Sequence, residues 1–153
     1  MLFRSYQIAL ADLLKHVGLT PDIVLGHSLG EVVAACFSSC IDKETAIQIV
    51  EARASAMNLI AGEGTMWVVG MSKENWTNHF AKDFPTLDLA AENGIRTIVL
   101  SGPEDIFIDL ASKLNQKDIF NQKTQINYAS HSRYVQKVVP HLRNKMKIGR
   151  AHV

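Results

Sequence analysis

The order of apolar and polar positions along the first part of the chain predicts an α/β fold. Apolar side chains recur at helical spacing over residues 6–17 and stop at Gly18, so we expect an amphipathic helix there. The short apolar run at residues 23–25, Ile-Val-Leu, is typical of a strand that is buried on both faces. A turn over residues 26–30 leads into a second helix, and Asp42 is a good N-cap for a third. Helix, strand, turn, helix and helix is the order expected around a parallel sheet.

After Gly64 the pattern changes to short strands that alternate with helices. The dipeptide Asn93-Gly94 is a strong hairpin-turn signal between two of these strands. The order β-α-β-β-α-β is that of a ferredoxin-like unit. We predict its strands at residues 66–71, 87–91, 96–100 and 125–128, and its helices at residues 73–84 and after Pro103.

This order predicts a large, hydrolase-like α/β subdomain with a smaller one inserted into it. Residues 1–64 would form the first part of the large subdomain, residues 65–129 the ferredoxin-like insertion, and residues 130–147 the return to the large subdomain. Pro140 lies inside the helical pattern of the last segment and should kink that helix about one turn earlier. Residues 148–153 break the pattern and resemble the translation of a sequencing-library adapter, so we expect a non-native tail on a fragment truncated at both ends.

Composition places the chain among globular proteins rather than disordered ones, since 47% of its 153 residues are hydrophobic and 20% are charged. Sixteen basic and 15 acidic residues leave a net charge of +1, which argues against nucleic acid or an anionic membrane as the main partner. No apolar run approaches the roughly 18 residues of a membrane span. Cys36 and Cys40 lie four apart on one helical pattern, so we interpret them as packing residues of a cytoplasmic protein, not as a disulfide or metal site.

Residues 26–30, Gly-His-Ser-Leu-Gly, have the G-x-S-x-G pattern of a nucleophile elbow. The pattern stands between a predicted strand and a predicted helix, as an elbow requires. The glycines would allow close backbone approach and lift the Ser28 hydroxyl out of the turn. The Leu29 amide and the helix N-terminus would then face developing negative charge. The alternative is a glycine-rich turn with a surface serine.

Arg53 lies on the apolar stripe of the predicted third helix, four residues from both Ile49 and Met57. A buried arginine needs an anion, because an unpaired guanidinium is costly to remove from water. Its partner is either a structural carboxylate, such as Glu31 or Glu51, or a substrate carboxylate held by two parallel hydrogen bonds. Spacing alone favours the structural carboxylate.

His131 follows the last predicted strand, where the chain should return to the large subdomain. A loop histidine there would be able to act as the base for Ser28, because folding and not sequence proximity gathers such residues. A lone histidine is otherwise mostly a surface residue. No acidic residue stands out as a third member, and a serine–histidine pair held by neutral groups would still be a nucleophile. The other histidines have no comparable claim as the base: His16, His27, His79, His141 and His152.

Together these residues resemble the acyltransferase domains of type I polyketide synthases and the related malonyl-CoA:acyl carrier protein transacylases. The resemblance covers residues 7–146 and rests on six segments that occur in the family's order. These segments are residues 21–31, 53–57, 64–66, 90–93, 99–103 and 128–132.

The resemblance implies a role for each matching residue. Ser28 would be the nucleophile that takes the acyl group from coenzyme A, and His131 would be the general base and acid of both half-reactions. Arg53 would bind the free carboxylate of a malonyl-type group, which reverses the preference for a structural partner. The Leu29 amide would supply half of the oxyanion hole. Substrate contacts are further implied for His27, Asn93, Tyr128 and Ser130.

The implied reaction moves a malonyl or methylmalonyl extender unit to Ser28 and then to the phosphopantetheine thiol of an acyl carrier protein. It belongs to polyketide or fatty-acid biosynthesis, with no metal and no bound cofactor. The implied partners are the carrier protein, an adjacent ketosynthase and other megasynthase domains. Residues 128–131 resemble the methylmalonyl version of the family's motif and Leu29 the malonyl version. Because one methyl group discriminates by only about 1–3 kcal/mol, the extender unit stays open.

Two other functions stay open. A serine esterase or thioesterase of the α/β-hydrolase kind shares the Gly-His-Ser-Leu-Gly elbow, and would give Arg53 no part in the reaction. The third function is that of a partial domain without catalysis. The family's opening strand and its Gly-Gln-Gly loop, which completes the oxyanion hole, have no counterpart in these residues. Loss of one oxyanion donor typically lowers the rate by about 10²–10³, so we expect the chain alone to be poorly active.

Overall fold

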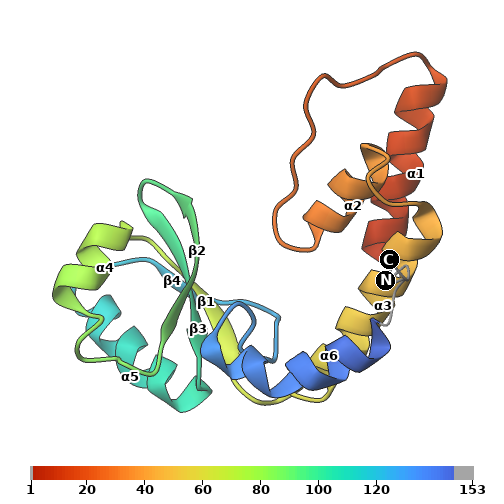
Figure 1. Cartoon of the computed structure of the whole chain (residues 1–153). Coiled ribbons are helices and arrows are strands. Elements are labelled where there is room, and N and C mark those ends of the chain that lie inside the picture. Colours follow the sequence, from red (N-terminus) through yellow and green to blue (C-terminus); the bar gives the residue numbers. More distant parts are fainter. Residues whose placement is uncertain (1, 147–153) are drawn as a thin grey trace. The chain divides into compact units, whose positions relative to one another are not determined.

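The chain forms two compact units in the computed structural model, which describes residues 2–146 (Figure 1). The N-terminal unit combines the residues up to Ala56 with those from Pro140 onward, and the central unit is Met57–Val139. All four strands of the described residues belong to the central unit.

Helices supply the regular structure of the N-terminal unit. The first one is followed by Gly18, whose φ of +86° favours glycine over residues with a side chain. The N-cap predicted at Asp42 is confirmed, because its carboxylate accepts the main-chain N–H of Thr45 at 2.7 Å. The helices are α1 (Leu2–His16), α2 (Gly30–Phe37), α3 (Lys43–Asn58) and α6 (Val139–Lys145), of which the last two extend a little past the unit's boundaries.

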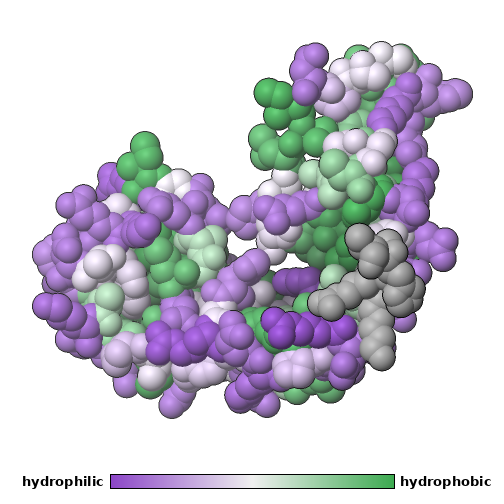
Figure 2. Space-filling model, in the orientation of Figure 1, coloured by the Kyte–Doolittle hydropathy of each residue, from purple (hydrophilic) through white to green (hydrophobic). Residues whose placement is uncertain are grey.

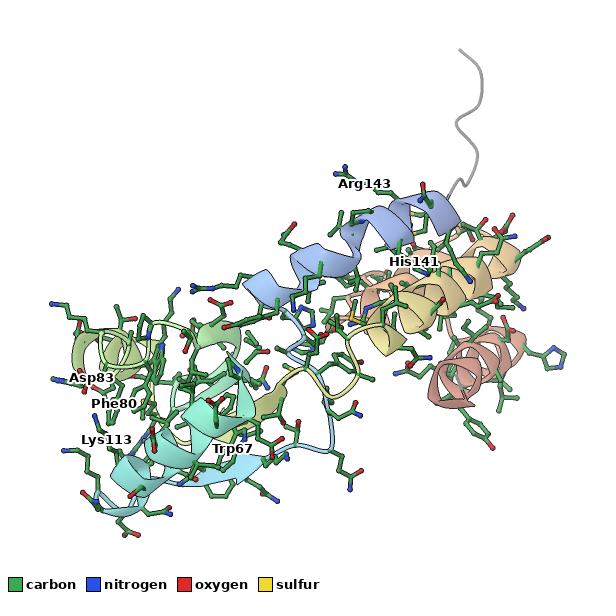
Figure 3. The ribbon with its side chains drawn as sticks, turned by 90° about the horizontal axis from the view of Figure 1, so that it is seen from below. Trp67, Phe80, Asp83, Lys113, His141 and Arg143 are labelled. Carbon is green, nitrogen blue, oxygen red and sulfur yellow. The ribbon has the colours of Figure 1, made fainter. Side chains whose placement is uncertain are left out.

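Polar contacts join the helices of this unit. Lys15 donates to the main-chain oxygen of Phe37 at 2.8 Å, which connects α1 to the end of α2. Lys43 pairs with Asp12 at 2.6 Å, which connects the start of α3 to α1. The α3–α6 contact includes His141, labelled in Figure 3, whose Nε2 lies 3.2 Å from the Ser55 hydroxyl. Each helix of the unit therefore has a polar link to another one.

Residues 23–25 do not form a strand, which corrects the sequence prediction. They have no regular structure, and the side chains of Ile23 and Leu25 are 80% and 87% exposed. A strand needs a hydrogen-bonded neighbour, and every strand in the described residues lies between Thr65 and Lys123 and pairs there. The predicted parallel sheet is therefore not present in the described part of the chain.

The apolar side of α1 is exposed as well. The predicted helix is confirmed, but Tyr6 and Leu10 keep 69% and 57% of their surface accessible, and Val17, just after the helix, keeps 61%. Figure 2 shows hydrophobic residues on the surface of this unit, over the segment that connects α1 to α2. The sequence pattern therefore predicts the helix correctly and its burial wrongly.

The central unit has the predicted ferredoxin-like order, β-α-β-β-α-β. Its sheet is antiparallel, and the strands lie side by side in the order β2-β3-β1-β4. Helices α4 and α5 lie on the same side of this sheet (Figure 1). The elements are β1 (Thr65–Val69), α4 (Lys73–His79), β2 (Asp88–Gly94), β3 (Thr97–Gly102), α5 (Glu104–Asn115) and β4 (Asn121–Lys123).

The core of the central unit lies between the sheet and these two helices. Phe107, Leu110 and Leu114 recur at helical spacing along α5 and are fully buried. The Phe107 ring stacks on Trp67 of β1, with 5.4 Å between the ring centres. Each such side chain contributes about 1.5–3 kcal/mol when fully buried, so this cluster is the main support of the unit. The other buried members are Val69, Met71, Trp76, Phe80, Phe84, Leu87, Ile98 and Leu100.

The β2–β3 hairpin turns two residues later than predicted. Its turn consists of Ile95 and Arg96, and Gly94 pairs with Thr97 across it. Two register shifts within β2 lengthen that strand relative to its partner, so Asn93 and Gly94 lie in the strand instead of the turn.

The last strand and the first helix of the unit also differ from the prediction. β4 begins with Asn121, which pairs with Val69 of β1, whereas the predicted strand at residues 125–128 has no regular structure. The sequence of β4, Asn-Gln-Lys, has no apolar side chain, so a hydrophobic pattern cannot reveal it. The helix predicted at residues 73–84 is shorter and ends at His79.

The chain enters and leaves the central unit through two segments that contact each other. The main-chain N–H of Ala129 donates to the Glu63 oxygen at 3.2 Å. Gly64 has a φ of +91°, and a Cβ there would lie 2.6 Å from the Gly102 oxygen, so only glycine fits. The compact unit therefore includes residues on both sides of the predicted 65–129 insertion.

Pro140 lies where one type of helix changes into another. A 3₁₀ helix, η1 (Arg133–Val138), is followed by α6, and Pro140 is the second residue of α6. Proline is tolerated in a first helical turn because its missing N–H has no partner to lose there. The predicted non-native tail at residues 148–153 lies outside the described residues. None of the described helices is both long and apolar enough to span a membrane.

Candidate functional site

Ser28 occupies a sharp turn directly before α2. Its φ of +55° is uncommon for a residue with a side chain and indicates local strain. The turn is closed by the N–H of Gly30, which donates to the His27 oxygen at 2.9 Å, and by the N–H of Glu31, which donates to the Ser28 oxygen at 3.0 Å. A Cβ at Gly26 would lie 2.3 Å from the backbone of Gly30 and Glu31. Glycine at position 26 is therefore what lets the chain fold back so tightly.

The N-terminus of α2 adjoins this turn. Leu29 takes the N-cap position with helical dihedral angles, and α2 begins at the next residue. Because α2 begins two residues after Ser28, the partial positive charge of its N-terminus lies close to this serine. Ser28 and Leu29 are half-buried and His27 is exposed.

A cavity of about 650 Å³ runs along the chain just before Ser28. Residues 23–27 form one side of it, and α1 and α2 contribute the rest through Gln7, Ala11, Gly30, Val33, Ala34 and Phe37. The lining has polar and apolar surface in similar amounts, and it includes the polar residues His27 and Gln7. The turn therefore borders a hollow large enough to take part of a small ligand.

Arg53 is half-buried on α3, which corrects the expectation of a buried side chain. Its neighbour Ala52 is among the buried residues of α3. Glu31 and Glu51, the two structural partners that the sequence suggested, are both exposed. Partial exposure lowers the desolvation cost that would have required a structural anion. The role of Arg53 in substrate binding stays a prediction.

His131 lies in the segment between β4 and η1, with a φ of +55°. The two residues before it are anchored: Ala129 is 1% exposed and Ser130 is 4% exposed, whereas His131 itself is exposed. The Ser132 hydroxyl donates to the Ala129 oxygen at 2.6 Å and accepts the N–H of Tyr134. His131 is therefore presented to the surface by a loop whose two ends are fixed.

Ser28 and His131 share an unusual backbone conformation. The described residues include four with a positive φ that are not glycine, namely Ser28, Ser39, Asp118 and His131. Such strain is found preferentially at functional sites. Ser28 and His131, the nucleophile and the base suggested by the sequence, are thus two of these four residues.

The remaining candidates divide between the two units. His27, Ser28, Leu29 and Arg53 belong to the N-terminal unit, and the other four, Asn93, Tyr128, Ser130 and His131, belong to the central unit. Asn93 is exposed on β2, while Tyr128 is half-buried. Within the residues that the structure describes, no three histidine, cysteine, aspartate or glutamate side chains gather as a metal site would require.

Sequence reasoning missed an ion pair beside His131. The Arg133 guanidinium donates to Asp88 through Nε at 3.0 Å and through Nη2 at 2.6 Å. The main-chain N–H of Arg133 donates to the same carboxylate at 2.7 Å. These hydrogen bonds from Arg133 hold the pKa of the Asp88 carboxyl below its ordinary value of 3.8. The two residues are 45 positions apart, so no local pattern in the sequence reveals the pair.

The family follows from comparison with known proteins. A sequence profile of the family described as "Acyl transferase domain" matches residues 3–152. The chain belongs to this family. Polyketide synthase GfsA of Streptomyces halstedii is 38% identical over 134 residues, which are 88% of this chain and 2% of that protein.

Solved acyltransferase domains have the same fold. The acyltransferase domain from module 8 of the salinomycin polyketide synthase aligns with a TM-score of 0.87 and 25% identity, over 93% of this chain and 34% of that one. The acyl transferase domain of SpnD, solved in complex with 2-(pent-4-yn-1-yl)malonyl, aligns with a TM-score of 0.75 and 26% identity. The alignment covers 90% of this chain and 34% of that one. The predicted α/β fold class and the family resemblance are confirmed, and the chain spans about a third of these solved domains' chains.

The loss of folding stability at acidic pH should depend in part on Asp88. Because its pKa is lower in the folded state, the ionised carboxylate stabilises the fold above the ordinary pKa of 3.8, and this stabilisation is lost as the pH falls through the lower folded-state value. For a partly exposed pair it amounts to about 1 kcal/mol or less. We expect Asp88→Asn to lower the free energy of unfolding at pH 6, with a smaller difference from the unsubstituted chain at pH 3. Urea unfolding followed by the fluorescence of Trp67 and Trp76 measures this, and a difference independent of pH would contradict it.

Proposed function

We propose that this acyl transferase family chain carries the nucleophile and base of an enzyme that transfers a malonyl-type extender unit. The donor is a coenzyme A thioester, and the acceptor is the phosphopantetheine thiol of an acyl carrier protein in polyketide or fatty-acid biosynthesis. The observation that carries the proposal is the strained turn at Ser28, with Gly26 against the start of α2. An ordinary glycine-rich turn has no need of a positive φ at the serine.

In the first half-reaction, His131 accepts the Ser28 hydroxyl proton while Oγ attacks the thioester carbonyl. The N-terminus of α2, beginning with the Leu29 amide, stabilises the negative charge that develops on the carbonyl oxygen. When the carbon–sulfur bond breaks, the coenzyme A sulfur takes the proton from His131, and acyl-Ser28 remains.

In the second half-reaction the roles of acid and base are repeated. The carrier thiol gives its proton to His131 and attacks the ester carbonyl of acyl-Ser28. The Ser28 oxygen leaves and recovers the proton from His131. The products are the acyl carrier thioester and the free enzyme, and no metal or bound cofactor takes part in either step.

Arg53 is the proposed ligand of the free carboxylate on the extender unit. A guanidinium matches a carboxylate with two parallel hydrogen bonds, and half-burial strengthens such a pair without a large desolvation cost. The malonyl derivative bound to the SpnD domain supports an extender unit with this carboxylate. His27, which lines the cavity beside the elbow, and Asn93, Tyr128 and Ser130 are the further proposed substrate contacts.

The partners of the proposed reaction are the acyl carrier protein, an adjacent ketosynthase and the other domains of a megasynthase. The relative named as a polyketide synthase supports this setting. The proposed location is the cytoplasm, where Cys36 and Cys40, both unpaired in the described structure, would stay reduced.

The proposal is tested by incubating the complete protein with malonyl-CoA and measuring its intact mass. We expect a malonyl adduct that maps to the peptide of Ser28 and disappears when a carrier protein with its phosphopantetheine arm is added. Hydrolysis of the adduct at the same rate with and without the carrier would favour a thioesterase instead.

Replacement of Arg53 separates the transferase from the esterase. We expect Arg53→Ala to lower kcat/KM for malonyl-CoA by about 10²-fold, because the carboxylate loses a charged, bidentate partner. Turnover of acetyl-CoA, which has no free carboxylate, should change little. Arg53→Lys is the matched control and should recover only part of the loss, since it keeps the charge without the planar fork. Stopped-flow acylation rates for the two thioesters measure this, and equal losses for both would contradict the proposed role.

A further inference from the structure

The loop around His131 is held in a conformation that needs support. His131 is exposed and has a φ of +55°, a region that costs energy for a residue with a side chain. The residues on either side of His131 are held by contacts of their own. Before His131, Ala129 is held by burial and by the hydrogen bond from its N–H to Glu63.

The residues after His131 are fixed by Asp88, the first residue of β2. Asp88 pairs with Ser101 of β3 in the sheet and is 20% exposed at its side chain, so its position is set by the core of the central unit. One of its oxygens, Oδ2, accepts the main-chain N–H of Arg133 at 2.7 Å, and the other, Oδ1, accepts Nη2 of the same residue at 2.6 Å. The carboxylate therefore holds the backbone two residues after His131 as well as a side chain.

A second contact binds the same segment to the chain just before β2. The Tyr134 hydroxyl donates to the main-chain oxygen of Thr86 at 3.2 Å. Residues 133 and 134 are thus tied to residues 86 and 88 at two points, and the start of η1 is aligned with the start of β2.

The Asp88–Arg133 pair differs from the other ion pairs of the described residues. The others are single contacts of a lysine with a carboxylate between well-exposed side chains, a type that contributes little. They are Lys43–Asp12, Lys113–Asp83, Lys123–Glu104 and Lys137–Glu63. The Asp88–Arg133 pair is a bidentate guanidinium–carboxylate contact, reinforced by a main-chain hydrogen bond.

We infer that Asp88 and Arg133 are positioning residues that fix the imidazole of His131 for proton transfer to and from the acyl-accepting serine. The inference rests on the proposed function, in which His131 is the base. Neither residue touches the reacting atoms in this scheme. Their effect passes through the backbone of residues 131–133, and small displacements of a catalytic group are costly, up to about a hundredfold in rate for 1 Å.

The experiment measures single-turnover acylation by malonyl-CoA in the complete protein. We expect Asp88→Ala to lower the acylation rate constant by about ten- to a hundredfold, with the half-saturating malonyl-CoA concentration and the final fraction of acylated protein unchanged. Arg133→Ala should lose less, because its main-chain N–H still reaches Asp88. The double variant should be no slower than Asp88→Ala, since both residues act through one contact.

The matched control removes an ion pair on the helical side of the same unit. Asp83, in the turn after α4, and Lys113 of α5 are 2.9 Å apart, and Figure 3 shows the two side by side. Asp83→Ala should leave the acylation rate unchanged. Transfer from acyl-Ser28 to the carrier thiol should slow in parallel with acylation in Asp88→Ala, because His131 serves both steps.

The outcomes separate the inference from the function on which it rests. If His131→Ala keeps the full acylation rate, the proposed function fails and the inference fails with it. If His131→Ala is inactive while Asp88→Ala matches Asp83→Ala, the inference is overturned and the proposed function stands. A lower final fraction of acylated protein at an unchanged rate constant also overturns it, since that result shows loss of folded protein only. Should Asp88→Ala not fold, Arg133→Ala is measured instead, because it keeps the main-chain hydrogen bond to Asp88. A slower acylation than in Asp83→Ala then supports the inference, and an equal rate overturns it.

Discussion

Ser28→Ala should abolish the acyl-enzyme and lower transfer of the malonyl group by about 10⁴-fold or more. The reason is chemical, because the alanine methyl group cannot attack a thioester, and the intermediate of both half-reactions disappears. The residual rate would come from the rest of the site, which binds and polarises the thioester without a nucleophile. Intact mass after incubation with malonyl-CoA measures the intermediate, and a radioactive or fluorescent carrier assay measures the transfer.

The matched control for this substitution is Ser39→Ala. Ser39 has a φ of +64°, close to the +55° of Ser28, and lies in the same unit. Both substitutions replace a serine whose φ is positive, so a general effect on the free energy of unfolding should be similar in the two variants. We expect Ser39→Ala to form the acyl-enzyme normally. A malonyl adduct that survives Ser28→Ala would assign the nucleophile to another residue and remove the basis of the proposed mechanism.

The elbow was predictable because its signal is local. Gly26 is required by a contact only four and five residues away, and Ser28 is strained by hydrogen bonds within the same turn. The same holds for Asp42, whose capping contact reaches only three residues. Short-range geometry of this kind is encoded in consecutive residues, and the family motif carries it.

The strand at residues 23–25 and the burial of α1 were not predictable in this way. An apolar run indicates that a segment favours burial. Strand formation also needs a neighbouring strand, which the run itself does not contain. In the described residues Ile23 and Leu25 have no such neighbour and are exposed. The reverse error occurred at β4, where the polar residues Asn121–Lys123 pair with β1 although their own pattern gives no sign of a strand.

The ferredoxin-like unit lies between these two cases. Its order of elements follows from alternating patterns along the sequence, and the structure confirms it. The exact hairpin turn depends on the register shifts between β2 and β3, which no single strand encodes. The Asp88–Arg133 contact is the extreme case, because it joins residues 45 positions apart and appears only once the sheet has formed.

His131→Ala should lower both acylation and transfer by about 10²–10⁴-fold, the usual contribution of a general base. Without an imidazole, the Ser28 hydroxyl must lose its proton to water in the first step, and the carrier thiol must do the same in the second. Added imidazole should restore part of the rate, because exposure of His131 leaves room for a small base at its position. His79→Ala is the control, since His79 is an exposed histidine of α4 in the same unit. Separate rate constants for acylation and for release to the carrier test the scheme. A loss confined to the first step would show that another group acts on the carrier thiol, and an unchanged rate in both would remove His131 from the mechanism.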